Sequence, residues 1–389
     1  MRLLDTLQHK LDALSARHQR RRCPVLDSPQ GPRVRIDGRD YLAFASNDYL
    51  GLANHPALIA AAGDAAVRWG VGGGASHLVA GHFGAHAELE QQLAAWLQLP
   101  AALLFSSGYQ ANLAVMTALL GRGDAVFADR LNHASLNDAC LLSRADFKRF
   151  AHHDLAQLAR LLAASTAPTK LIAVDAVYSM DGDCAPLAAL LALAERFDAW
   201  LYVDDAHGFG VLGDGRGSLA EAGLRSDRLI YMATLGKAAG VAGAAVAGHA
   251  TLIDWLINSA RPFIFTTSTS PLLAAVLSTS LTLIASEPQR RQALQARIAQ
   301  LKHGLAGLRW PLLASATPIQ PLLVGSNADA LALSAALRER GIWVPAIRPP
   351  TVPAGSARLR IALSAAHQEA DVAELVTALR ELAHTLPAA

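Results

Sequence analysis

Short apolar runs alternate with helical patterns along the middle of the chain. The apolar runs read AALLF, DAVFA, KLIAVDAV, AWLYVDD, RLIYMAT and GAAVAG, and they lie between residues 101 and 248. Continuous apolar runs of this length are typical of strands that are buried on both faces. The helical patterns between most of them predict helices on both sides of a mostly parallel sheet, so we predict an α/β fold.

The two ends of the chain show other patterns. Leucines at positions 4, 7, 11 and 14 share one helical face, which predicts an N-terminal helix that packs on the body of the protein. A hairpin is predicted over residues 33–45, and the tail after residue 319 mixes strands and helices. We therefore predict a large domain over residues 46–285 and a smaller α+β domain, which combines residues 1–45 with residues 286–389.

Composition narrows the class of protein. The chain has 389 residues, 52% of them hydrophobic, and a net charge of +2. This charge is too small to indicate a nucleic-acid or membrane partner, and no apolar run is long enough for a membrane span. The cysteines at positions 23, 140 and 184 lie far apart and outside any metal-binding pattern, so we predict a reduced, cytoplasmic protein without a metal site.

Polar residues follow the predicted strand AALLF. Ser106, Ser107, Gly108 and Tyr109 lie between this strand and the next predicted helix. Ligands of open parallel sheets bind at the carboxyl ends of strands, and a helix N-terminus offers unpaired N–H groups that suit a phosphate. An ordinary turn and a core role for Tyr109 are the alternatives.

A second polar cluster follows the strand AWLYV. Asp204 and Asp205 end this strand and His207 comes directly after them. A carboxylate at such a desolvated position is expected to need a cationic partner. The alternatives are a helix cap or a structural His–Asp pair, whereas a metal site would need further ligands nearby.

Lys237 is the third polar feature at a strand end. It lies in the stretch YMATLGKAAG, where its neighbours are almost all apolar or small. Such an environment disfavours the ammonium form and lowers the pKa of a lysine, and a neutral amine is what Schiff-base chemistry needs. A surface lysine in a loop is the alternative. Together the three clusters offer a phosphate site, a buried acid and a reactive amine, the set that pyridoxal 5'-phosphate (PLP) requires.

The chain resembles the α-oxoamine synthases, a family of fold type I PLP enzymes. The resemblance covers nearly the whole chain and rests on the motifs ASNDYLGL, LLFSSGYQAN, DRLNHASLNDA, SMDGD, VDDAHGFGVLG, TLGKAAG and ARLRIALSAAH, all in family order. It implies a large domain with a mostly parallel mixed sheet between helices, a smaller α+β domain, and PLP as the cofactor.

The resemblance also implies a role for individual residues. Lys237 would hold the aldehyde of PLP and then act as the base, Asp204 would pair with the ring nitrogen, and His133 would stack on the ring. Further PLP contacts would come from Gly108, Tyr109, Ser179, His207 and Thr234, together with Thr266 and Thr267 of a neighbouring subunit, which implies a homodimer with shared sites. The amino-acid substrate would meet Asn47 and Arg360, and the acyl thioester would meet Arg20, Arg348 and Thr351.

Two short stretches bear on the substrate. RRRCP near the N-terminus and IRPPTVPAG at 347–355 favour the family members that condense L-alanine with a pimeloyl thioester in biotin synthesis. The acyl group could be carried by coenzyme A or by an acyl carrier protein. KAAG after the lysine, together with Ala75 and His77, departs from the family pattern and could tune the acyl pocket. A sister reaction of glycine with another acyl-CoA and a non-catalytic homologue are the alternatives.

Two other features suggest different chemistry. GVGGGA at residues 70–75 matches a loose dinucleotide-binding pattern, which would make the protein an NAD dehydrogenase. That motif should follow a strand and begin a helix, whereas here it follows a predicted helix, so we interpret it as a flexible loop. His152 and His153 are interpreted as surface residues and not as ligands.

Overall fold

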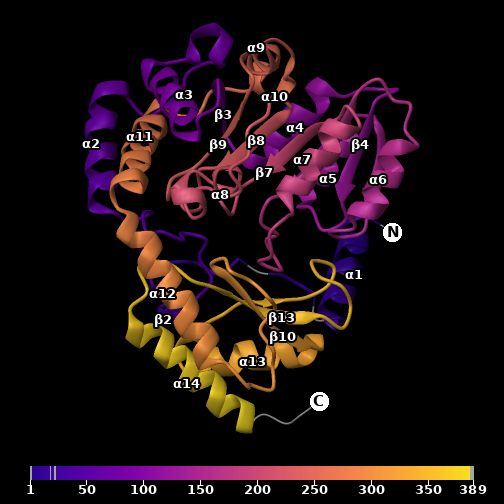
Figure 1. Ribbon diagram of the computed structural model, residues 1–389. Helices are drawn as coiled ribbons and strands as arrows, with labels where there is room; N and C mark the ends of the chain where they lie inside the picture. Colours follow the sequence, from indigo (N-terminus) through magenta and orange to yellow (C-terminus); the bar gives the residue numbers. More distant parts are fainter. Residues whose placement is uncertain (1, 18, 22, 386–389) are drawn as a thin grey trace. The chain divides into compact units, whose positions relative to one another are not determined.

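The chain forms two compact units (Figure 1). The computed structural model describes residues 2–17, 19–21 and 23–385. The larger unit combines Leu50–Ser179 with Asp183–Arg291. The smaller unit combines Met1–Tyr49, Met180–Gly182 and Gln292–Ala389.

A 7-stranded sheet is the centre of the larger unit, in the order β3-β9-β8-β7-β6-β4-β5. The strands are β3 (Ala101–Phe105), β4 (Ala125–Asp129), β5 (Asp146–Phe150), β6 (Lys170–Asp175), β7 (Trp200–Asp204), β8 (Leu229–Thr234) and β9 (Ala244–Gly248). β9 is antiparallel to β3 and to β8, and the other neighbours are parallel. The predicted mostly parallel mixed sheet is therefore confirmed.

β5 is the strand that the apolar pattern did not predict. Its sequence is DFKRF, and only Phe150 among its residues is fully buried. β5 lies at the edge of the sheet, where one side of the strand has no neighbouring strand. Edge strands commonly carry charges, so this one lacks the continuous apolar run of a central strand.

Helices cover both faces of the sheet (Figure 1). They are α2 (Pro56–Trp69), α3 (Gly84–Leu97), α4 (Gly108–Leu119), α5 (Ala134–Leu142), α6 (Leu155–Ala163), α7 (Leu187–Arg196), α8 (Ser218–Glu221), α9 (Ala250–Ser259), α10 (Arg261–Ile264) and α11 (Pro271–Ser286). Adjacent strand residues such as Val126 and Phe127 point to opposite faces, and both are 0% exposed. Burial of each such side chain stabilises the fold by about 2 kcal/mol.

α11 is the most apolar of the long helices in this unit. Its buried side chains include Leu277, Leu281 and Ile284, and the helix packs on α2 and α3. In the described part of the chain, no single helix is long and apolar enough to cross a membrane. α11 and α12 (Pro288–Gly304) pass the test of length and composition only when they are taken together as a bent pair.

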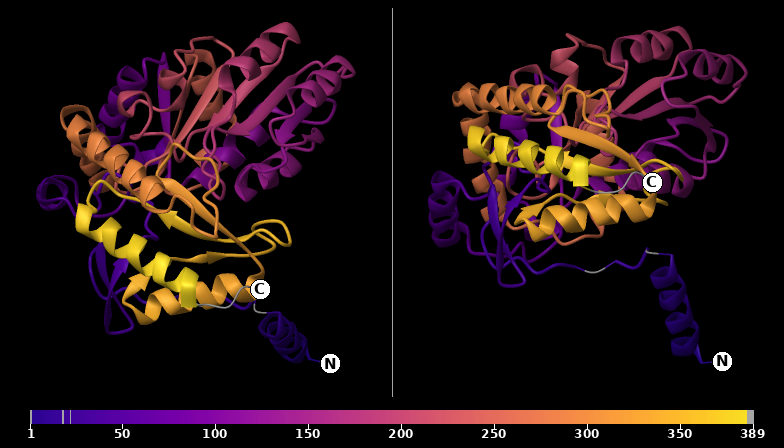
Figure 2. Two further views of the ribbon diagram at one scale, coloured as in Figure 1. Left: turned by 60° about the horizontal axis from the view of Figure 1, so that its bottom comes forward. Right: turned by 90° about the horizontal axis from the view of Figure 1, so that it is seen from below.

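The smaller unit holds two 3-stranded sheets, in the orders β1-β2-β11 and β10-β13-β12. Its strands are β1 (Arg33–Ile36), β2 (Arg39–Ala43), β10 (Ile319–Gly325), β11 (Ile342–Trp343), β12 (Ala346–Ile347) and β13 (Ala357–Ala362). The helices that accompany them are α12, α13 (Asn327–Glu339) and α14 (Glu369–Thr385). α12 and α14 lie side by side (Figure 2), and Arg380 of α14 donates to the carbonyl oxygen of Gly304 at 2.8 Å.

The N-terminal helix forms as predicted, but its packing does not. α1 (Leu3–Ala16) carries the predicted leucine face, yet none of its residues is buried. Leu4 is 75% exposed and Leu7 is 44% exposed. The prediction that this face packs on the body of the same chain is therefore wrong.

Candidate active site

One cavity gathers most of the residues that the sequence selects. It lies where β6, β7 and β8 end, since Asp175, Asp204 and Thr234 are the last residues of these strands. The cavity is lined by Gly108, Tyr109, Asn112, His133, Ser135, Asp175, Val177, Ser179, Asp204, Ala206, His207, Met232, Thr234 and Lys237. This is the strand end at which open parallel sheets bind ligands.

Lys237 and His207 meet in this cavity. The Nζ atom of Lys237 lies 2.9 Å from the Nε2 atom of His207. Lys237 is half-buried in the loop after β8, whereas His207 is 6% exposed. An amine at hydrogen-bond distance from an imidazole can exchange a proton with it, so the pair suits general base chemistry.

Asp204 is held by neutral donors. Its Oδ2 atom accepts from the amide of Asn112 at 3.0 Å, and its Oδ1 atom accepts from the N–H of Ala206 at 3.1 Å. Asn112 also accepts from the hydroxyl of Tyr202 and donates to Ser135. Asn112 is not among the predicted site residues, although its position one turn into the helix that starts at Gly108 indicates that it faces the same strand ends.

Asp205 has a structural role, in contrast to its neighbour. Its carboxylate accepts from the N–H and the hydroxyl of Ser218, both at 2.6 Å, and from the hydroxyl of Tyr231 at 2.8 Å. Burial raises the pKa of Asp205 to about 6. The expected cationic partner is not among these contacts, because three neutral donors satisfy the carboxylate instead.

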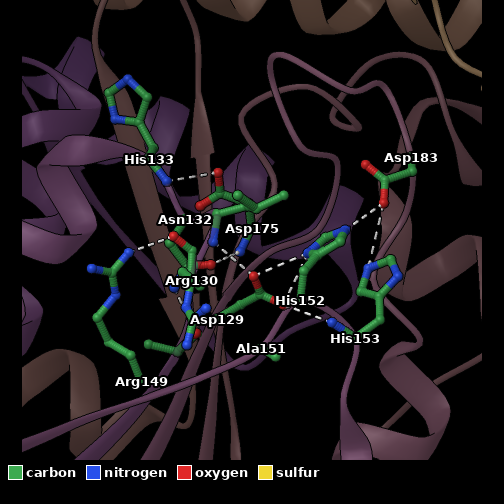
Figure 3. Close-up of polar contacts among 12 residues, drawn as sticks. Asp129, Arg130, Asn132, His133, Arg149, Ala151, His152, His153, Asp175 and Asp183 are labelled. Carbon is green, nitrogen blue, oxygen red and sulfur yellow. Dashed lines mark hydrogen bonds and ion pairs between the residues drawn. The ribbon is translucent and has the colours of Figure 1, made fainter. Parts of the chain in front are cut away.

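Figure 3 shows His133, the N-cap of α5, which also lines the cavity. Its backbone N–H donates to Asp175 at 3.0 Å, and its Nδ1 atom lies 2.7 Å from the hydroxyl of Ser135. Burial, and then the charge of Asp204, raises the pKa of Asp175 well above its ordinary value. His133 is an exposed residue that lines the cavity, so its ring can stack on a planar ligand there.

Gly108 lets the first turn of α4 approach β8 closely. A Cβ atom on Gly108 would lie 2.6 Å from the Cγ2 atom of Thr234, which is closer than such atoms pack. Ser107 caps the helix, since its hydroxyl accepts from the N–H of Gln110 at 3.2 Å. The first turn of the helix, whose N–H groups suit a phosphate, therefore lies against Thr234, whose hydroxyl donates to the carbonyl oxygen of Ala206 at 3.3 Å. Tyr109 is 48% exposed and is not a core aromatic.

Thr266 and Thr267 do not line this cavity. They line another small pocket, which includes His77 and Phe263. The residues of GVGGGA follow α2 and precede a π-helical turn over His77–Gly81. The motif thus lacks the strand before it and the α-helix after it that dinucleotide binding requires.

The amino-acid and acyl candidates belong to the smaller unit. Arg360, on β13, is 5% exposed, and its Nη2 atom donates to the Oδ1 atom of Asn47 at 3.1 Å. Arg358 lies two residues earlier on the same face and pairs with Asp181 at 2.6 Å. Arg358 is not among the predicted site residues, although side chains two residues apart in the strand ARLRIA lie on the same face.

The candidates for the acyl side meet in part. The side chain of Arg21 donates to the hydroxyl of Thr351 at 3.2 Å, and the N–H of Thr351 donates to the carbonyl oxygen of Arg348 at 3.0 Å. Arg20 itself is exposed. Thus Thr351 and Arg348 adjoin the RRRCP segment through Arg21.

The lining residues of the cavity fit PLP. The amine of Lys237 suits the aldehyde, the buried carboxylate of Asp204 suits the ring nitrogen, and the helix N-terminus at Gly108 suits the phosphate. Gly108 lacks a Cβ atom and so lets this helix N-terminus pack against Thr234, which supports the last of these assignments.

Comparisons with known proteins agree with this geometry. The family model described as aminotransferase class I and II matches residues 39–379. The chain is 64% identical to a protein of Chromobacterium violaceum named 8-amino-7-oxononanoate synthase, over 95% of this chain and 96% of that one. A protein of the same name from Nitrosomonas europaea is 62% identical, over 96% of this chain and 98% of its own length.

A solved structure is similar over nearly the whole length. The serine palmitoyltransferase of S. paucimobilis, solved with a bound PLP–myriocin aldimine, has a TM-score of 0.93 and 29% identity, and the match covers 99% of each chain. The chain uses PLP as its cofactor, and it belongs to the aminotransferase class I and II family and, within it, to the α-oxoamine synthases.

Proposed function

We propose that the protein condenses L-alanine with a pimeloyl thioester to give 8-amino-7-oxononanoate, CO₂ and a free thiol, a step of biotin synthesis. The observation that carries this proposal is the 64% identity with a protein of that activity, over 95% of the chain. The four residues to which we assign the chemistry, Lys237, Asp204, His207 and His133, line one cavity, which supports the proposal.

PLP, when bound, supplies an electron sink that makes the Cα proton of the amino acid acidic. Lys237 would bind the aldehyde, and its freed amine would then take the Cα proton of L-alanine. His207 lies 2.9 Å away and would orient the amine and share its proton. Asp204, fixed by Asn112, would keep the ring nitrogen protonated.

The smaller unit would bind the carboxylate of the amino acid. Arg360 presents a planar guanidinium that can pair with a carboxylate through two parallel hydrogen bonds. Asn47 holds one guanidinium nitrogen in place at 3.1 Å. Arg348 and Thr351 would contact the acyl thioester, together with Arg20.

A homodimer in the cytoplasm completes the proposal. Thr266 and Thr267 lie outside the cavity of their own chain, so we assign them to the phosphate of a neighbouring subunit. Size-exclusion chromatography with light scattering tests the dimer. Activity restored by mixing two inactive variants, Lys237→Ala and Thr267→Ala, would test whether the sites are shared.

A thioester panel tests the reaction itself. Purified protein with PLP is offered L-alanine, glycine or L-serine together with pimeloyl, acetyl, succinyl or palmitoyl thioesters, on coenzyme A and on acyl carrier protein. Thiol release and product mass are measured. We expect L-alanine with the pimeloyl thioester to be preferred. A preference for glycine with a shorter acyl group would indicate the sister reaction, and no thiol release with any pair would overturn the proposal.

A further inference from the structure

His152 lies in a network that the predicted reaction does not use, and it is not the plain surface residue that the sequence suggested (Figure 3). Its Nδ1 atom lies 3.0 Å from the Oδ1 atom of Asp129, and its Nε2 atom lies 2.7 Å from the Oδ2 atom of Asp183. The side chain of His152 is 25% exposed, while that of Asp129 is 1% exposed. Both ring nitrogens therefore face a carboxylate at hydrogen-bond distance.

Asp129 connects this imidazole to the loop that carries His133. It is the last residue of β4, and its carboxylate accepts from the N–H of Leu131 at 2.8 Å. The same carboxylate accepts from the N–H of His153 at 3.1 Å. Residues 130–132 then lead directly to His133, whose ring lines the cofactor cavity.

Asp183 connects the other ring nitrogen to the loop that carries Ser179. The carbonyl oxygen of Asp183 accepts from the N–H of Tyr178 at 3.0 Å, and Val177 forms an antiparallel bridge with Cys184. Asp183 thus lies at the base of the turn from which Ser179 lines the cavity. One imidazole therefore joins the bases of two loops that form two walls of the cofactor site.

The protonated form of His152 suits this position. A neutral imidazole has one N–H donor, whereas the imidazolium has two, one for each carboxylate. Burial on its own would lower the pKa of His152, but the hydrogen bonds to Asp129 and Asp183 outweigh it and raise the pKa to about 9. Charged hydrogen bonds of this kind are shorter and stronger than neutral ones.

A metal ion fits the same cluster less well. Ligand atoms of His152, His153 and Asp183 lie within 4.8 Å of one another. However, the two imidazole rings stack with centroids 3.7 Å apart and planes 27° from parallel. A metal ion must lie near the plane of each ligating ring and about 2.1 Å from each nitrogen, and stacked rings do not offer such a point.

We propose that His152 is a positioning residue, which ties the loop of His133 to the loop of Ser179 and so fixes the shape of the cofactor cavity. This inference rests on the proposed PLP-dependent function. His152 is not among the residues that line the cavity, so its effect on the cofactor would be transmitted through Asp129 and Asp183.

The test compares His152→Gln with a matched control at the next position. Glutamine keeps a polar side chain, but its N–H donors are on a single nitrogen. It therefore cannot place one donor on each carboxylate, as the two ring nitrogens of His152 do. His153→Asn is the control, because His153 has a φ angle of 58°, a left-handed conformation that asparagine adopts readily, and its contact with Asp129 uses only the backbone. Its ring nitrogen Nε2 lies 3.6 Å from Asp183, beyond hydrogen-bond distance. Leu162→Ala, a buried change in α6, provides a stability control.

Two measurements separate positioning from general stability. Hydrogen exchange of the full chain without PLP should become faster over residues 130–133 and 177–184 in His152→Gln, but not in His153→Asn. PLP titration of the same proteins should give a Kd about tenfold higher for His152→Gln, the size of effect expected for a lost charged hydrogen bond, and a Kd within about twofold of wild type for His153→Asn. The visible circular dichroism of saturated His152→Gln should also fall.

Two outcomes would overturn the inference. One is wild-type exchange and PLP affinity in His152→Gln. The other is the same pattern of change in Leu162→Ala, because it would reduce the effect of His152 to general stability. A wild-type protein that binds no PLP would instead overturn the proposed function, and the inference with it.

Discussion

The Nζ atom of Lys237 lies 2.9 Å from the Nε2 atom of His207, so the reactive amine has a proton partner before any ligand arrives. We predict that Lys237→Ala abolishes turnover, by at least about 10³-fold, because the variant loses both the amine that binds PLP and the base. The visible absorption of PLP bound through Lys237 should disappear as well. An unchanged melting temperature would show that the fold is intact, and turnover retained in this variant would contradict the assignment.

The close approach of Gly108 to Thr234 predicts the effect of a substitution at Gly108, and a second substitution at Thr234 should reverse part of that effect. Gly108→Ala would bring a Cβ atom 2.6 Å from the Cγ2 atom of Thr234, so the two elements must separate. We expect the Kd for PLP to rise about tenfold, since the helix N-terminus and the Thr234 hydroxyl would no longer meet one phosphate.

The rescue uses the atom that clashes. Thr234→Ser removes Cγ2 and keeps the hydroxyl, so this change alone should alter the Kd by no more than about twofold. The double variant Gly108→Ala, Thr234→Ser should then bind PLP better than Gly108→Ala alone. Equal Kd values for these two proteins would show that the contact does not shape the phosphate site.

The sequence predicted the central sheet well because its strands are buried on both faces and therefore read as apolar runs. β5 was missed because an edge strand tolerates charged residues such as Lys148 and Arg149. The leucine face of α1 predicted the helix correctly, but periodicity reports only that a face is apolar. It does not say which surface covers that face, so the predicted packing failed.

The candidate site likewise contains residues that the sequence predicted and residues that it did not. Lys237, Asp204 and His207 could be selected because a polar residue after an apolar strand is conspicuous. Asn112 and Asp175 were missed because each acts through a fold-dependent contact: Asn112 reaches Asp204 from another element, and Asp175 accepts the N–H of His133. His152 was taken for a surface residue for the same reason, since its two carboxylates lie far from it in the sequence.

Glu90 gives a prediction about pH. Its side chain is 14% exposed, it accepts from the N–H of Leu104 at 3.0 Å, and burial raises its pKa from 4.5 to about 7. A raised acid pKa means that ionisation is disfavoured in the fold, so this group costs stability as the pH rises from the unfolded to the folded pKa. His82 lies 3.8 Å away, and burial lowers its pKa.

We therefore expect Glu90→Gln to stabilise the protein at high pH. Glutamine keeps an oxygen that accepts from Leu104 and has no charge to bury. The gain in free energy of unfolding should be near zero at about pH 4.5 and should approach about 3 kcal/mol above about pH 7. Glu88→Gln, at an exposed position of the same helix, is the control and should show no such trend. Parallel pH profiles for Glu90→Gln and wild type, from chemical denaturation, would refute the assignment.

Arg360 and Arg358 lie on the same face of β13 but have different partners. We therefore expect Arg360 to bind the substrate carboxylate and Arg358 to stabilise the fold. Asp181 pairs with Arg358 at 2.6 Å, whereas Arg360 donates to Asn47 at 3.1 Å. We predict that Arg360→Lys raises the KM for L-alanine about tenfold or more, because a lysine cannot pair with a carboxylate through two parallel hydrogen bonds. Steady-state kinetics at saturating thioester measure this effect.

The control is Arg358→Lys, which should lower the melting temperature and leave the KM for L-alanine within about twofold, since the Arg358 guanidinium pairs with Asp181. If the two variants raise the KM equally, Arg360 is not the specific site for the carboxylate of the amino acid.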